Sequence, residues 1–103
     1  MNNELPPYIN HFHEETGTTF VFKRDDKNTR ILHIENHTNV YDEAMGIDDA
    51  IDIFLNGTPQ PKFVKWNKLI SVTKLDDEIV WWYWINEPEK VVMIVSCFHK
   101  YKP

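Results

Sequence analysis

Two apolar runs near the C-terminal end give the clearest pattern in the chain. They cover residues 79–85 and 91–95, and Pro88 lies in the polar segment between them. β-Branched and aromatic residues fill both runs, which are too short for core helices, and apolar side chains occupy both alternating faces. The pattern predicts a β-hairpin in the middle of a sheet, with residues 86–90 as its loop.

Two more strands are predicted just before this hairpin. Residues 63–66 and 69–74 are strand-like, and tight turns are predicted at 67–68 and 76–77. Because each run follows the last through a short turn, the four strands are expected to form an antiparallel meander.

A helix is predicted upstream of these strands. Apolar residues recur at the helical period from Ile47 to Leu55, Asp48 is placed to cap the first turn, and Asn56-Gly57 provides a stop. Residues 58–61 then lead away in an extended conformation. The apolar stripe is expected to cover one face of the meander.

The N-terminal part is less regular. Residues 1–16 predict a short helix, because prolines precede apolar residues at spacings of one, three and four. Residues 18–22 predict a strand that ends at a polar turn, 25–28. Residues 30–37 fit either a strand or a helical face, and residues 36–46 predict a loop.

Together these elements predict a single α+β domain over residues 1–103, with a mainly antiparallel sheet of four to six strands packed against one or two helices. A chain of 103 residues matches the usual size of one domain. Its hydrophobic share of 42%, including 14% aromatic residues, is enough to build a core.

The charge of the chain limits the class of binding partner to expect, and its cysteine content indicates the cellular compartment. The formal charge of −5 disfavours non-specific nucleic-acid binding and favours a basic partner. A cluster of lysines nevertheless keeps a phosphate contact open; its members are Lys62, Lys65, Lys68 and Lys74. The single Cys97 is predicted to be a small buried residue in a reducing compartment. Without a signal-like or membrane-spanning segment, a cytoplasmic protein with no membrane contact is expected.

Histidines supply the first candidate chemistry. His33 and His37 would share a face on a helix, and such a pair can act as base and acid near neutral pH. On a strand they would stand about 13 Å apart, at roughly 3.3 Å per residue, which is too far to share a proton. His11, His13 and Glu14 do not by their spacing specify three or four converging ligands, so neither a metal nor another cofactor is predicted.

A series of short motifs runs through the chain from Arg30. In order they are the His33 to His37 pair, the helix 47–55, Pro59 to Pro61, four strands, and Val-Ser-x-Phe at 95–98. This order resembles the barnase, EndoU, colicin and RelE-like ribonuclease superfamily over residues 30–98, and is most similar to its phage-borne and polymorphic-toxin branches. The resemblance implies a small toxin-type, metal-independent endoribonuclease that acts on RNA and has a cognate immunity protein.

The resemblance also implies roles for particular residues. In such ribonucleases a base removes the 2′-OH proton, a cation steadies the phosphate and an acid protonates the leaving oxygen. His33 and His37 match the motif histidines, and Ser96 matches a hydroxyl on the last strand. Lys65 and Thr73 are added as candidates from their predicted strand positions.

The acidic, tryptophan-rich composition supports a second hypothesis. Immunity proteins and antitoxins that neutralise basic nucleases are often small, acidic and rich in aromatic residues, and they have no catalytic activity of their own. The surplus aromatic surface also suits a homodimer. The predicted binding face consists of Trp66, Asp76, Asp77, Glu78, Trp81, Trp82 and Trp84. A third hypothesis is an accessory protein with a structural role, for which the sequence contains no specific pattern.

Overall fold

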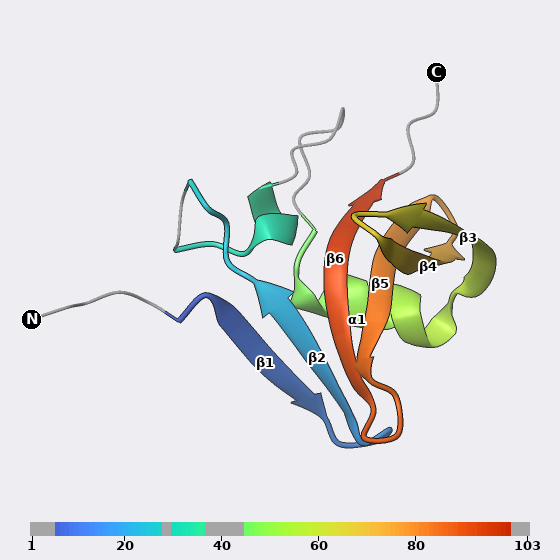
Figure 1. Ribbon diagram of the computed structural model, residues 1–103, viewed down its shortest axis with the longest axis horizontal. Helices are drawn as coiled ribbons and strands as arrows, with labels where there is room; N and C mark the ends of the chain where they lie inside the picture. The colour runs from blue at the N-terminus through green and yellow to red at the C-terminus, as the bar shows by residue number, and fades with distance from the viewer. Residues whose placement is uncertain (1–5, 28–29, 37–44, 100–103) are drawn as a thin grey trace, which may run out of the picture.

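The computed structural model describes residues 6–27, 30–36 and 45–99, which form a six-stranded sheet, one α-helix and a short 3-10 helix (Figure 1). In chain order the elements are β1 (Tyr8–His13), β2 (Thr18–Lys23), η1 (His33–Asn36), α1 (Ile47–Asn56), β3 (Thr58–Lys65), β4 (Lys68–Leu75), β5 (Glu78–Asn86) and β6 (Val91–His99). The predicted α+β class is confirmed.

The order of strands in the sheet is β1-β2-β6-β5-β4-β3. Four of the five pairings are antiparallel, and the pairing of β2 with β6 is parallel. The predicted mainly antiparallel sheet is therefore confirmed, and β3 to β6 pair one after another as predicted, but the whole sheet is mixed and is not a meander. The N-terminal hairpin joins the far side of β6, a long-range pairing that no local turn signal encodes.

The tryptophan-rich hairpin is confirmed. β5 lies between β4 and β6, and the β5–β6 ladder runs from Glu78 opposite His99 to Asn86 opposite Val91. Val80 and Val92 in this pair are fully buried. The register shifts after Trp81 and again near Trp84, which locally increases the twist.

The predicted N-terminal helix is wrong where the structure describes it, because Tyr8–His13 is a strand. Exposed and half-buried side chains alternate along it, a period of two. Ile9 contacts the core, and every residue of the strand has a partner in β2. Six residues are too few for a stable helix, so pairing with β2 overrides the weak helical spacing.

Residues 30–36, the described part of the segment that fitted either a strand or a helical face, form neither a strand nor an α-helix. Leu32 makes a single bridge to Arg24, and His33–Asn36 then turns as η1, with Leu32 and Ile34 buried. The backbone N–H of Leu32 donates to Glu35 Oε1 at 2.8 Å, which stabilises this turn. Of the predicted loop 36–46, residues 37–44 lie outside the described residues.

The helix α1 matches its prediction in extent but not in its cap. Gly46, and not Asp48, is the N-cap residue, and its N–H donates to Asp49 Oδ2 at 2.8 Å. The helix ends at Asn56, and the N–H of Gly57 donates to Ile53 O at 2.8 Å. The predicted stop is confirmed.

One face of the sheet is covered by α1 (Figure 1). The ring of Phe54 meets three aromatic rings, at centroid distances of 5.1 Å to Phe20, 4.8 Å to Trp82 and 6.1 Å to Trp84. Phe20 is fully buried. We call the opposite side of the sheet the open face.

Gly57 lies so close to the sheet that a side chain does not fit. A Cβ there would stand 2.5 Å from Ile53 O, 2.7 Å from Thr73 Cγ2 and 2.8 Å from Lys74 O. We expect Gly57→Ala to lower the free energy of unfolding by about 1 to 3 kcal/mol, the usual cost of overpacking. Urea unfolding followed by tryptophan fluorescence measures this loss.

Gly46→Ala is the matched control at the other end of α1. The nearest atom to a Cβ there is Asp49 Oδ2 at 3.7 Å, an ordinary contact. Because Ala is a poorer N-cap residue than Gly but meets no clash here, its cost should be no more than about 1 kcal/mol. Equal losses at the two glycines would contradict the close approach of Gly57 to β4.

Candidate functional site

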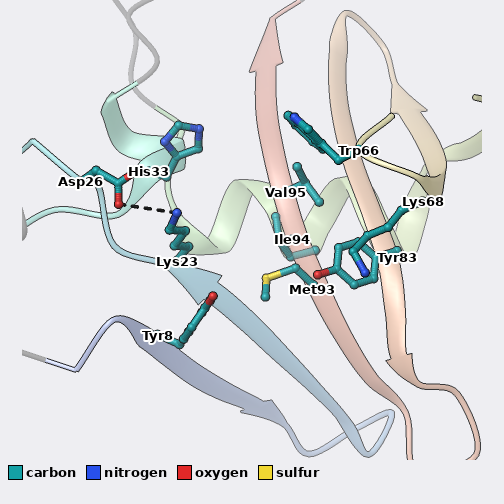
Figure 2. A pocket seen from close by; sticks show the side chains of 10 residues that line it. All are labelled: Tyr8, Lys23, Asp26, His33, Trp66, Lys68, Tyr83, Met93, Ile94 and Val95. Atoms are coloured by element: carbon teal, nitrogen blue, oxygen red, sulfur yellow. Dashed lines mark ion pairs between the residues drawn. The ribbon is translucent and has the colours of Figure 1, made fainter. Parts of the chain in front are cut away.

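The open face carries a hollow of about 470 Å³ (Figure 2). The side chains around it come from β1, β2, β4, β5, β6 and from the segments beside them. They are Tyr8, Lys23, Asp26, His33, Trp66, Lys68, Tyr83, Met93, Ile94 and Val95. Aromatic rings, ammonium groups and one imidazole therefore border the same concavity.

Lysines on this face lie over aromatic rings. Lys68 Nζ is 4.9 Å from the ring centroid of Tyr83, and Lys65 Nζ is 4.8 Å from that of Trp66 and 5.2 Å from that of Trp81. A cation over a ring face is attracted by the negative face of the π system. The contacts place positive charge beside the exposed ring of Trp66 and the half-buried rings of Trp81 and Tyr83, in a chain that is acidic as a whole.

His33 stands at the edge of the hollow with a carboxylate behind it. Its Nδ1 is 3.5 Å from Asp25 Oδ1; the side chain of Asp25 is 6% exposed and that of His33 is 46% exposed. The other oxygen of Asp25 accepts the backbone N–H of Lys27 at 3.0 Å. A carboxylate facing Nδ1 favours the tautomer that is protonated there, in which Nε2 is the basic nitrogen of the ring.

Asp25 is a residue that the sequence reasoning missed as part of a site. It was assigned only to the turn after β2, and its contact with His33 depends on how η1 folds back on that strand. Asp26 beside it forms an ion pair with Lys23 at 3.5 Å, drawn in Figure 2. Both partners are exposed, so this pair constrains Lys23 only weakly.

The other predicted catalytic residues do not line the hollow. Thr73 is buried below the end of α1, where its Oγ1 accepts a hydrogen bond from Trp82 Nε1 at 2.9 Å. Ser96 is buried in β6 opposite Trp81. Lys65 lies beside the hollow against Trp66, and His37 lies outside the described residues.

The predicted partner-binding tryptophans are divided between the two faces. Trp66 lines the hollow, and Trp81 packs on the open-face ring of Phe63 at 4.9 Å. Trp82 and Trp84 instead pack against Phe54 beneath α1. The four rings do not form one surface.

The predicted acidic residues gain members from α1. Partial burial raises the pKa of Glu78, His99 at 3.8 Å lowers it, and the charges of Asp49, Asp52 and Asp76 raise it further. Asp77 lies beside Asp76 in the turn between β4 and β5. We call Asp49, Asp52, Asp76 and Glu78 the acidic ridge, and none of its members lines the hollow.

A metal site has no support in the part of the chain that is described. Within residues 6–27, 30–36 and 45–99, no three His, Cys, Asp or Glu side chains are grouped to hold a metal ion. His13 instead shares a hydrogen bond of 2.9 Å with the hydroxyl of Thr16. Over the same residues, no helix has the length and apolar character needed to cross a membrane.

Cys97 is fully buried, as the sequence predicted. Burial, with smaller contributions from Asp49 and Glu78, raises the pKa of its thiol to about 12. Because the thiolate is the reactive form, we expect the native protein to react with a thiol reagent at pH 8 at least tenfold more slowly than the unfolded chain. Stopped-flow labelling in buffer and in urea measures the ratio, and equal rates would contradict the burial.

Comparisons of the chain with protein-family models, with curated proteins and with solved structures found no match. The function is therefore argued from the hollow and the acidic ridge themselves.

Proposed function

We propose that the open-face hollow binds RNA and that His33 acts there as the general base of a metal-independent endoribonuclease. The observation that carries this proposal is the meeting, at one concavity, of an imidazole backed by Asp25 with Lys23, Lys68 and exposed rings. Bases can stack on the rings, while ammonium groups attract the phosphates between them.

The proposed reaction needs three groups. Nε2 of His33 takes the proton of the ribose 2′-OH, the 2′ oxygen attacks the neighbouring phosphorus, and the bond from phosphorus to the 5′ oxygen breaks. Lys23 and Lys68, and not the Lys65 predicted from the sequence, act as the cations of the site. They offset the charge that develops on the phosphate, and one of them protonates the leaving oxygen. The products are a 2′,3′-cyclic phosphate and a free 5′-OH.

The net charge of −5 is compatible with this proposal because the charges are unevenly placed. The four carboxylates of the acidic ridge are outside the hollow, and Asp26, the acid that does line it, is paired with Lys23. Local potential governs the approach of an anion, since exposed charges further away than about 8 Å are largely screened at physiological salt.

We expect His33→Ala to reduce RNA cleavage about a hundredfold or more, while RNA affinity stays within about twofold, because the imidazole acts on a proton and the lysines hold the phosphates. Asp25→Asn should reduce cleavage less, since the ring remains but loses its orienting charge. Gel assays of a fluorescent single-stranded RNA measure cleavage, and fluorescence anisotropy measures binding.

His11→Ala is the control, because His11 is in β1 and does not line the hollow. It should cleave like the wild type. A wild-type chain that binds RNA but does not cleave it would rule out the catalytic part of the proposal and leave RNA binding standing. A chain that neither binds nor cleaves would rule out the whole proposal.

The acidic ridge supports a second candidate function, the neutralisation of a basic nuclease toxin. Asp49, Asp52 and Asp76 all act on Glu78, and a folded chain gains no stability from placing like charges together. A cationic partner would relieve this repulsion, and acidic surfaces speed the association of such partners.

Expression in a bacterial host separates the two functions. A ribonuclease should arrest growth, and His33→Ala should relieve the arrest. A neutralising protein should be harmless alone and should protect cells against a co-expressed basic nuclease toxin. In that case Asp52→Lys with Asp76→Asn should weaken protection at least tenfold, because the ridge supplies the attraction and neither residue caps α1. Colony counts on inducing medium measure both outcomes.

A further inference from the structure

The two edges of the sheet are built differently. The β3 edge contains Pro59 and Pro61, and its register shifts between Gln60 and Phe63. Prolines and irregularities of this kind protect an edge strand against pairing with another chain. The β1 edge has neither a proline nor a shift, and it contains no Lys, Arg, Asp or Glu. Among the described strands, only β2 pairs with it.

The hydrogen bonds of β1 show which backbone groups point outward. Arg24 N donates to Pro7 O at 2.8 Å, in the register that places Tyr8 opposite Lys23. Odd-numbered residues of β1 therefore exchange hydrogen bonds with β2, and even-numbered ones direct their N–H and C=O groups away from it. The outward-directed residues are Tyr8, Asn10 and Phe12.

The same three residues have exposed side chains. Tyr8 is 47% exposed and Phe12 is 59% exposed, and Tyr8 faces the hollow on the open face. Backbone groups that pair with no described strand and exposed aromatic rings therefore coincide on one short strand. Such an edge is a template for another strand.

We propose that β1 pairs with the β1 strand of a second copy of this chain, antiparallel and about a two-fold axis perpendicular to the sheet. With Asn10 opposite Asn10 of the other copy, each Tyr8 lies opposite a Phe12. All three facing pairs are then hydrogen-bonded pairs, since every outward N–H meets an outward C=O. Two cross-strand aromatic pairs form on the open face.

The second copy is favoured over another partner because this register is self-complementary, as a two-fold interface requires. β1 brings no Lys, Arg, Asp or Glu side chain into the contact, so the charge of −5 on each copy places no like charges directly opposite one another there. The pairing joins the two sheets edge to edge and sets both hollows on the same side of the dimer.

The contact is short, with six residues from each copy. It is smaller than the usual stable interface of roughly 800 Å² per partner, so the dimer should dissociate at low concentration. Sedimentation velocity and light scattering from micromolar to millimolar protein should show the mass rise from 12.3 kDa towards twice that value.

Asn10→Pro is the sharpest test, because it deletes an outward N–H and leaves the hydrogen bonds to β2 intact. We expect dimerisation to weaken at least tenfold in this variant and in Phe12→Lys. Val64→Lys is the matched control, since Val64 is a 70% exposed residue on the other edge strand, and it should dimerise like the wild type. Circular dichroism confirms that each variant is folded.

A wild-type chain that remains monomeric at millimolar concentration would overturn the proposal. So would a dimer that both β1 variants leave unchanged, because that dimer would use another surface. Neither outcome depends on RNA binding or cleavage, so this test stands apart from that of the proposed function.

Discussion

The packing of Phe54 against the sheet is the contact on which the rest of the structure depends. Its ring meets Phe20 of β2 and Trp82 and Trp84 of β5, strands that are far apart in sequence. Edge-to-face aromatic pairs contribute about 0.5 to 1.5 kcal/mol each beyond the area they bury. One side chain of α1 thus ties the N-terminal hairpin and the C-terminal strands into one core.

Covering one face also decides what the other face can do. Trp82 packs beneath the helix, where its indole N–H donates a hydrogen bond to Thr73, and Cys97 is buried in the same core layer. The open face keeps Trp66, Tyr83 and the lysines that lie over their rings. Core formation therefore separates structural aromatic residues from available ones, and it leaves the acidic ridge outside the hollow.

The elements that the sequence predicted correctly are those with strong local patterns. The helix buries an apolar stripe at its own period, and the β5–β6 hairpin consists of two short runs of β-branched and aromatic residues. β1 has only half-buried alternation over six residues, and its partner strand decides its conformation. The parallel pairing of β2 with β6 and the contact of Asp25 with His33 arise from tertiary structure alone, which is why both were missed.

The sequence predicted the types of residue in the candidate site, but not which particular residues lie together on the open face. Alternation along β5 already separates Trp81 from Trp82 and Trp84, yet it does not say which side the helix covers. The lysines resolve this choice physically. Lys23 and Lys68 are on the face that Tyr83 shares, and burying their ammonium groups beneath an apolar helix without partners would cost several kcal/mol. The helix must take the other face, so the positions of two lysines determine which tryptophans remain available for binding.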